Sequence, residues 1–146
     1  MKLIDLKQNI CLAPDYVRLR NEHSEALLTE RVGIAQTEAW LAEDCVEVRC
    51  LVEGKELLGA AVLYLNKKGE IAFFSKRPGE GAGTVLLQAA LEAARDRNIG
   101  SVWAWTPTSN IPAQKAFLKC GFKNCGELSR SHNEKVHRGF IFRRDI

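Results

Sequence analysis

Three glycines at alternate positions stand directly before a long helical pattern: Gly79, Gly81 and Gly83. Glycine has no side chain, so backbone N–H groups at these positions can approach a bound anion closely. The first turn of a helix also leaves N–H groups unpaired and carries the positive end of the helix dipole. The spacing therefore predicts a loop that holds a phosphate-bearing ligand through its backbone.

A strand, a helix and a second strand must position this loop. Residues 70–75 read EIAFFS and predict an apolar strand, and apolar residues recur at helical spacing from about 81 to 98. Residues 101–106 read SVWAWT and predict the next strand. This order predicts a parallel β-α-β crossover. A further helix follows Asn110 and stops at Gly121, so the glycine loop and Asn110 each follow a strand of this unit.

The rest of the chain alternates between short strands and helical patterns. We expect a strand over 2–6, a helix from 14 to about 31, a short helix over 36–41 and strands over 46–52, 57–65, 123–128 and 136–142. Tight turns join the strands between 46 and 75 into an antiparallel meander, and the last two strands close the sheet as a hairpin. The strand over 57–65 is almost continuously apolar, which predicts that both its faces are covered.

The composition is that of an ordinary globular protein. The 146 residues fit a single domain over 1–146, with 46% hydrophobic and 27% charged residues. A net charge of +3 is too small to favour nucleic acid, and no apolar run is long enough for a membrane span. The five cysteines form no C-x-x-C pair, so neither a disulfide framework nor a metal site is expected. The first residues lack the apolar core of a signal peptide, so we expect a cytoplasmic protein.

Two motifs in the central unit resemble those of the GNAT superfamily of acyl-CoA-dependent N-acyltransferases. The stretch 78–83, PGEGAG, looks like the family's Q/R-x-x-G-x-G/A loop, which holds the CoA pyrophosphate. The stretch 110–122 looks like its N-x-x-A…G-F segment beside the pantetheine arm. The stretch 19–41 is similar in character to the ribosomal-protein N-terminal and amino-sugar branches. The resemblance implies an α/β (α+β) fold with a mixed, mostly antiparallel sheet of about six or seven strands, helices on both faces and two strands splayed apart for the cofactor.

The resemblance also implies acetyl-CoA as the acyl donor, with no metal. The strand over 73–75 would run beside the pantetheine, the glycine loop would bind the pyrophosphate, and Arg77 would add charge. The residues expected to contact the cofactor are Phe73, Phe74, Ser75, Arg77, Gly79, Glu80, Gly81, Ala82, Gly83, Thr84, Asn110, Ala113 and Phe117.

Two positions depart from the family pattern. Pro78 stands where Gln or Arg is usual in the loop motif. Phe117 stands where many relatives have a tyrosine that protonates the leaving CoA thiolate, and a phenyl ring has no proton to give. The acid is then another group, such as Tyr64 on a neighbouring strand, or it is water, or the thiolate leaves unprotonated. Packing is the alternative role for Tyr64.

The implied chemistry is direct transfer of an acetyl group to an amine, which must lose a proton. Glu70, at the start of its strand, is a candidate general base, directly or through water. Backbone N–H groups near Phe74 and Ser75 would hold the oxyanion of the tetrahedral intermediate. Three further pairs of side chains are candidates for contacting the acceptor, each with a structural alternative as surface charge, core packing or hairpin: Glu22 and Glu25, Trp103 and Trp105, His132 and His137.

The sequence therefore predicts an N-acetyltransferase acting on the primary amine of a small molecule or peptide, as a monomer or a homodimer. No nucleic-acid or membrane partner is expected. A non-catalytic acyl-CoA-binding module is the main alternative, favoured by the missing tyrosine. A dinucleotide-binding half-domain is disfavoured, because the glycines read G-x-G-x-G rather than G-x-G-x-x-G.

Overall fold

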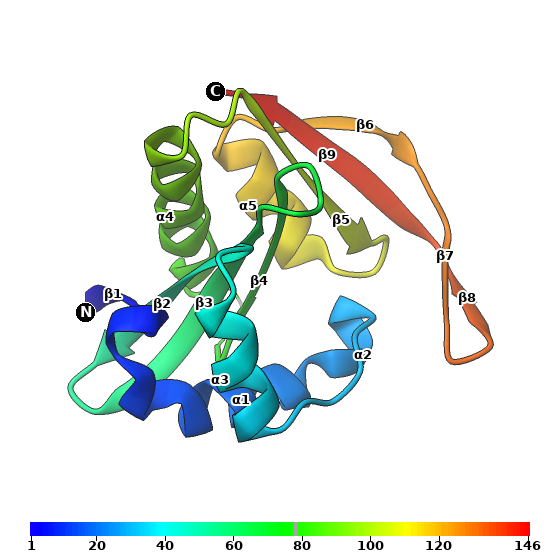
Figure 1. Cartoon of the computed structure of the whole chain (residues 1–146). Helices are drawn as coiled ribbons and strands as arrows, with labels where there is room; N and C mark the ends of the chain where they lie inside the picture. The colour runs from blue at the N-terminus through cyan, green and yellow to red at the C-terminus, as the bar shows by residue number, and fades with distance from the viewer. Residues whose placement is uncertain (78) are drawn as a thin grey trace.

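The computed structural model describes residues 1–77 and 79–146, so Pro78, the first position of the loop motif, lies outside the described residues. Seven strands form the main sheet in the order β1-β2-β3-β4-β5-β9-β6 (Figure 1). Their bounds are Lys2–Asp5, Val46–Glu53, Glu56–Tyr64, Glu70–Ser75, Ser101–Pro107, Gly139–Asp145 and Lys123–Glu127 in that order. Among the strands of the described residues, only β4 and β5 pair in parallel, and the other neighbours in this sheet pair antiparallel. The predicted mixed, mostly antiparallel sheet is thus confirmed.

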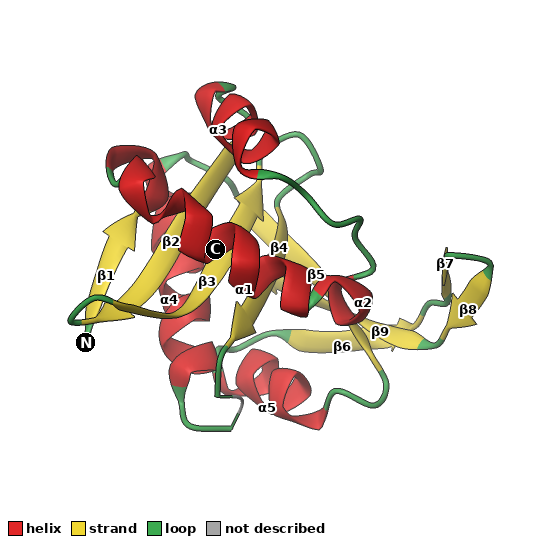
Figure 2. Ribbon diagram, turned by 90° about the horizontal axis from the view of Figure 1, so that it is seen from below, coloured by secondary structure: helices red, strands yellow, loops and turns green. Residues whose placement is uncertain are grey.

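Helices cover both faces of this sheet (Figures 1 and 2). On one face lie α1, Ala13–Glu22, and α3, Ile34–Ala42, with the short α2, Ser24–Leu27, at the end of α1. On the other face lie α4, Ala82–Asp96, and α5, Ile111–Lys119. Two short 3-10 turns, Leu6–Gln8 and Ile10–Leu12, join β1 to α1. Among the described residues, no helix is both long enough and apolar enough to cross a membrane.

The helix expected from 14 to about 31 is wrong beyond Glu22. The chain breaks at His23, makes the single turn of α2, and leaves it at Leu28, which has a left-handed backbone with φ of 54°. Asn21 explains why the helix cannot continue. Its side-chain amide donates to the backbone oxygen of Val32 at 2.9 Å and its side-chain oxygen accepts from the Val32 N–H at 3.0 Å, which draws the following loop back along α1.

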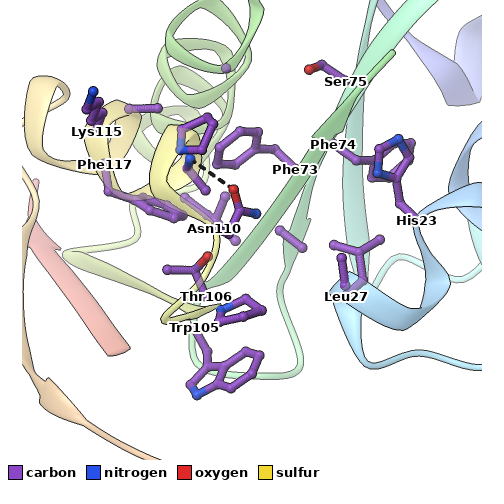
Figure 3. Close-up of a pocket in the computed structure, with 18 of the residues that line it drawn as sticks. His23, Leu27, Phe73, Phe74, Ser75, Trp105, Thr106, Asn110, Lys115 and Phe117 are labelled. Carbon is purple, nitrogen blue, oxygen red and sulfur yellow. Dashed lines mark hydrogen bonds between the residues drawn. The ribbon is translucent and has the colours of Figure 1, made fainter. Parts of the chain in front are cut away.

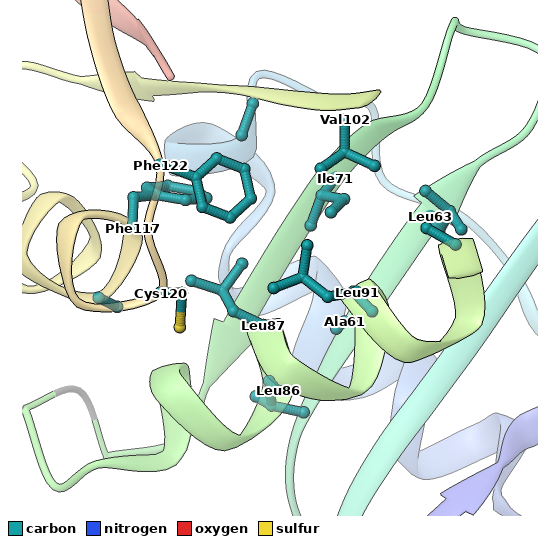
Figure 4. Packing of buried hydrophobic residues seen from close by; sticks show 14 of the residues in the cluster. Ala61, Leu63, Ile71, Leu86, Leu87, Leu91, Val102, Phe117, Cys120 and Phe122 are labelled. Atoms are coloured by element: carbon teal, nitrogen blue, oxygen red, sulfur yellow. The ribbon is translucent and has the colours of Figure 1, made fainter. Parts of the chain in front are cut away.

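The core lies on both sides of β3, as the continuous apolar run predicts. Alternate residues of a strand face opposite ways, so Ala60 and Val62 pack under α1 while Ala61 and Leu63 pack under α4. Figure 4 shows the α4 side, where the leucines of α4 meet the strands and the phenylalanines of the α5 region. This packing fixes α4, and with it the loop that precedes α4, relative to β4.

The end of α4 is fixed by charge. Arg97 follows the helix and donates from Nε to the Glu47 carboxylate of β2 at 3.0 Å and from Nη2 to Asp44 at 2.7 Å. Burial, the largest single influence on the Glu47 carboxyl, raises its pKa, but hydrogen bonds from Arg49 and Arg97 outweigh burial and leave the pKa lowered. Glu47 therefore stays ionised inside a network of arginines.

The C-terminal strand prediction over 136–142 is wrong as a single strand. The chain instead forms β7, Arg130–His132, and β8, Lys135–His137, which pair as a separate ribbon that projects beyond the main sheet (Figure 1). It then enters the sheet as β9, between β5 and β6. The break falls at Arg138, whose backbone oxygen accepts from the Thr108 N–H at 3.0 Å and so holds the chain against the end of β5.

Candidate active site

A cleft opens where β4 and β5 diverge. The two strands pair at one position, Glu70 opposite Trp103, next to a hydrogen bond from the Trp103 N–H to the Gly69 oxygen at 3.2 Å. Beyond that pair the strands line a cleft of about 290 Å³, together with the starts of α4 and α5 and the α1–α2 break (Figure 3). The splayed strands that the resemblance implied are thus confirmed.

Strand pairing decides which backbone groups of β4 face the cleft. The Lys76 N–H donates to the Leu58 oxygen of β3 at 2.7 Å, so the pair of Lys76 and Leu58 is hydrogen-bonded. Backbone groups alternate sides along a strand, so Phe74 also turns its N–H toward β3, while Phe73 and Ser75 turn theirs away from β3 toward β5. The cleft wall therefore offers the N–H groups of Phe73 and Ser75, rather than those of Phe74 and Ser75.

The glycine loop leads into the mouth of the cleft. Gly79 and Gly81 both line it, with φ of 87° and 86°, and a Cβ on either would meet nothing within 4 Å. Glycine is thus used there for its left-handed backbone and for open space above it. Gly81 caps α4 with no side-chain hydrogen bond, and no acidic residue stands in the first turn. The unpaired N–H groups at the start of α4 suit an anion.

Gly83 serves a different purpose from the other two glycines. A Cβ at Gly83 would stand 2.9 Å from Cε2 of Phe73 and 3.4 Å from the Cβ of Ala116. The absence of a side chain lets α4, β4 and α5 meet closely. It places the start of α4 directly beside the β4 residues whose N–H groups face the cleft.

The second motif forms the opposite wall. The Asn110 side chain caps α5 by accepting from the Ala113 N–H at 3.2 Å, as Figure 3 shows. Capping orients α5 so that Lys115 and Lys119, one turn apart, both line the cleft. These two lysines were not predicted from the sequence, although their i, i+4 spacing, which puts them on one face of the helix, was a usable signal. They add positive charge near the start of α4.

Phe117, which the resemblance matches to the family's tyrosine, is packed rather than free. It is only 2% exposed, and its ring lies 5.4 Å from Phe73, 5.2 Å from Phe122 and 5.1 Å from Phe142, centroid to centroid. These aromatic contacts tie α5 to β4 and β9. The residue lines the cleft with a ring that has no proton to donate.

Glu70 lies at the other end of the cleft, next to an arginine that sequence reasoning missed. Its Oε2 accepts from both terminal nitrogens of Arg130, at 3.4 and 3.3 Å. The Arg130 guanidinium also lies 5.5 Å from the ring centroid of Trp103 and 5.1 Å from that of Trp105. Because Arg130 comes from the separate β7–β8 ribbon, no local sequence pattern connects it to β4. Trp105 lines the cleft, whereas Trp103 is not among the residues that line it.

His23 forms the wall opposite Trp105 and was also missed. Its ring is stacked on Phe74, with centroids 5.6 Å apart and planes at 27° (Figure 3). Leu27, one turn further on, lines the cleft beside it. Burial lowers the pKa of His23 below its ordinary value, and the nearby Glu22 carboxylate raises it only partly back. Sequence reasoning placed His23 inside a continuous helix, so nothing indicated that it would face a cleft.

The structure brings most predicted site residues to the cleft. Those lining it are Glu70, Phe73, Phe74, Ser75, Gly79, Gly81, Gly83, Thr84, Asn110, Ala113 and Phe117. Arg77 does not line it, because its guanidinium lies 3.6 Å from Glu56, which also binds Lys76 at 3.0 Å. Glu80 and Ala82 lie in the loop and the first turn of α4 without lining the cleft.

The remaining candidates lie elsewhere. Tyr64 packs against Trp40 at 6.2 Å and beneath the ammonium of Lys67 at 4.6 Å, and burial is the main cause that raises its pKa. Packing, the alternative open in the sequence, is the role this geometry fits. The other four candidates stand on exposed helix surface or in the ribbon, outside the cleft: Glu22, Glu25, His132 and His137.

Known proteins share this architecture. Residues 13–122 match the family described as Acetyltransferase (GNAT) family. Streptothricin acetyltransferase from Streptomyces lavendulae is 40% identical over 48 residues, which span 33% of this chain and only 25% of that relative. Ribosomal-protein-alanine N-acetyltransferase from Brucella melitensis superposes with a TM-score of 0.86 at 17% identity, covering 100% of both chains. Spermidine N-acetyltransferase from Vibrio cholerae, in complex with CoA and spermine, gives 0.81 at 16% identity, covering 99% of this chain and 94% of that one.

A sheet split at its parallel pair, with a glycine-capped helix at the mouth of the split, is the arrangement that the resemblance implied. The chain belongs to the GNAT acetyltransferase family, as the match over residues 13–122 shows. The structural similarities, at low sequence identity, establish the fold that the resemblance implied.

Proposed function

We propose that this protein is an N-acetyltransferase that moves the acetyl group of acetyl-CoA directly to the primary amine of a small molecule or peptide. One observation carries the proposal: the unpaired N–H groups at the start of α4 open into the same cleft as the free backbone edge of β4. An anion at the first and an extended, amide-bearing chain along the second are what CoA would supply.

The chain's own residues would divide the work as follows. Residues 79–84 bind the pyrophosphate through backbone N–H groups, with Lys115 and Lys119 supplying positive charge from α5. The free N–H groups of Phe73 and Ser75 bind the pantetheine arm and the thioester oxygen, and stabilise the negative charge that develops on that oxygen. Asn110 holds α5 in place as the far wall. Acetyl-CoA supplies the activated acetyl group.

The acceptor would approach between the α1–α2 break and the end of β5, where His23 and Leu27 line one side of the cleft and Trp105 and Arg130 line the other. Relatives in the family include enzymes named for a ribosomal-protein alanine and for spermidine, which are both amines. This range supports an amine acceptor and leaves both small-molecule and peptide acceptors as candidates. All five cysteines are free, which suits a reducing compartment, and we place the reaction in the cytoplasm.

The experiment is a screen of amines, amino acids, polyamines, amino sugars and peptides with acetyl-CoA, with release of CoA thiol as the readout. Acetyl-CoA binding is measured in parallel by calorimetry. Tight binding without CoA release above background for any acceptor would favour the alternative of a non-catalytic acyl-CoA-binding module. Acetylation of an oxygen rather than a nitrogen, seen by mass spectrometry, would also contradict the proposal.

A matched pair of glycine variants tests the pyrophosphate loop. We expect Gly81→Glu to weaken acetyl-CoA binding by at least about a hundredfold, because the new side chain fills the anion site and adds like charge. Gly54→Glu is the control, since Gly54 also has a positive φ of 60° and open space around its Cβ but lies in the β2–β3 turn. Both variants carry similar backbone strain, roughly 1–2 kcal/mol, so only the position differs. Equal affinity in the two variants would remove the loop from the binding site.

A further inference from the structure

Few side chains in the cleft could accept the proton that the acceptor amine must lose. The charged and titratable side chains that line it are His23, Glu70, Lys115, Lys119 and Arg130. The lysines and the arginine are donors at neutral pH, so only His23 and Glu70 can accept a proton. These two stand in very different surroundings.

The Glu70 carboxylate forms an ion pair with Arg130. Both contacts from the guanidinium end on the same carboxylate oxygen, and the Glu70 side chain is only 13% exposed. Arg130 in turn covers Trp103 and Trp105. The carboxylate therefore anchors the arginine that joins the β7–β8 ribbon to the main sheet.

Stacking holds the His23 ring in place but leaves its ring nitrogens without a hydrogen bond to the described residues. Its ring face lies on Phe74, which is 4% exposed and is itself packed against Tyr16 with centroids 5.9 Å apart. Neither ring nitrogen of His23 has a hydrogen-bond partner among the residues that the structure describes. Because stacking uses the face of the ring, its nitrogen-bearing edge stays free for a ligand in the cleft.

The charges around His23 leave it neutral. Its own segment carries Glu22 and Glu25, both exposed, and also Arg20 one turn earlier, whose guanidinium donates to the Glu30 backbone oxygen at 3.0 Å. Glu22 raises the pKa of His23 less than burial lowers it. Across the cleft, Glu70 and Arg130 neutralise each other. Tyr16 and Phe74 add no charge at neutral pH. A neutral imidazole has a free lone pair and can accept a proton.

We propose that His23 is the general base that takes the proton from the acceptor amine. The inference rests on the proposed function. The acceptor first loses one proton to solvent and attacks the thioester carbonyl carbon as the neutral amine. A C–N bond forms, and the nitrogen becomes positively charged with one proton too many. His23 takes that proton and becomes imidazolium. The C–S bond breaks, the sulfur leaves with the bonding pair as CoA thiolate, and the imidazolium returns its proton to solvent.

In this assignment the α1–α2 break supplies the base, and β4 both supports the base and supplies the oxyanion donors. Phe74 supports the base with its side chain, on one face of β4, while its neighbours Phe73 and Ser75 turn free N–H groups toward the thioester. The proton acceptor and the oxyanion donors are therefore positioned by consecutive residues of one strand. Glu70 acts at a distance from the transfer, by holding Arg130 over the tryptophans.

The test is the pH dependence of kcat/KM in His23→Gln, with an acceptor whose amine titrates well above pH 8. For the unmodified protein we expect the rate to rise through a pKa below 6.5, and His23→Gln to lose that limb with a drop of about a hundredfold at pH 7. Acetyl-CoA affinity should change less than about twofold, because His23 is absent from the loop that binds the anion. Imidazole added to His23→Ala should restore part of the rate.

Two controls separate the alternatives. His132→Gln removes a histidine of the β7–β8 ribbon and should keep both the rate and the limb. Glu70→Gln should keep the rise of kcat/KM with pH. If Glu70→Gln loses that rise while His23→Gln keeps it, the base is Glu70 and the proposal is overturned. If the unmodified protein binds no acetyl-CoA or acetylates no amine, the proposed function fails instead, before the variants are compared.

Discussion

At the scale of single residues, Arg130 connects parts of the chain that are far apart in sequence. Its guanidinium pairs with Glu70 of β4 and lies over two tryptophans of β5, so one side chain binds both strands that border the cleft. A guanidinium over an aromatic face gains electrostatic attraction as well as contact. Its removal should therefore be felt in stability and in the tryptophan environment together.

We expect Arg130→Ala to lower the free energy of unfolding by about 1–2 kcal/mol, because it leaves the 13% exposed Glu70 carboxylate without its partner. Tryptophan emission should shift to longer wavelength as water reaches Trp103 and Trp105. Urea denaturation followed by fluorescence measures both. Arg138→Ala is the matched control, since Arg138 pairs with Glu127 on the open surface and should cost less than about 0.5 kcal/mol. Equal effects in the two variants would contradict a structural role for Arg130.

Some residues of the cleft could be predicted from the sequence and others could not. The glycines and Asn110 were predicted from sequence as cofactor-contacting residues, and they do line the cleft, because backbone conformation at this loop is a local property. The capping of α5 by Asn110 was not predicted. His23 and Arg130 were not predicted. Their positions depend on a helix break fixed by Asn21 and Val32 and on a ribbon that folds back across β5, and neither produces a periodic pattern.

At the scale of elements, α4 must be held in a fixed position for the proposed anion site to form. Its apolar face packs on the sheet, its N-terminus opens into the cleft, and Arg97 fixes its other end to Glu47 and Asp44. The Glu47 pKa is lowered in the folded protein, so its contribution to stability is present above the ordinary value of 4.5. It is lost as the pH falls through the folded value.

We therefore expect Glu47→Gln to lower the free energy of unfolding at pH 7 by about 2 kcal/mol, because two arginines lose a charged acceptor. The difference from the unmodified protein should shrink as the pH is lowered below 4.5, where the native carboxylate itself becomes protonated. Chemical denaturation at a series of pH values measures this. Glu53→Gln, on the exposed end of the same strand, should show no such pH-dependent gap. A constant gap from pH 7 to pH 3 would disprove the assignment.

The elements themselves were largely predictable. Residues 70–75 were predicted as the strand that is β4, and the strand over 57–65, the long helix and the crossover are confirmed, because apolar periodicity specifies elements that lie in the core. The errors fall at α2 and at the β7–β8 ribbon. Both are short and mostly outside the core, so hydrophobic pattern carries little information about them.

At the scale of the whole molecule, the sheet consists of two halves. One half is β1 to β4 and the other is β5, β9 and β6, and they are joined through the single pair of Glu70 and Trp103. We expect the Phe73 and Ser75 amides to exchange hydrogen faster than the Phe74 amide, which faces β3. Acetyl-CoA should slow the first two and leave Phe74 unchanged. Hydrogen exchange followed by NMR distinguishes the three, and slow exchange of all of them without ligand would contradict the pairing.

The split sheet has a mechanical consequence. In an unbroken sheet, every interior strand is hydrogen-bonded to protein along both of its edges. Here acetyl-CoA would lie in the gap between β4 and β5 and bridge the two halves of the sheet. Its amide groups would take the place of a neighbouring strand. The rigidity of the protein would then depend on whether acetyl-CoA is bound. The connection between the two halves of the sheet would loosen when the product leaves and tighten when the next acetyl-CoA binds.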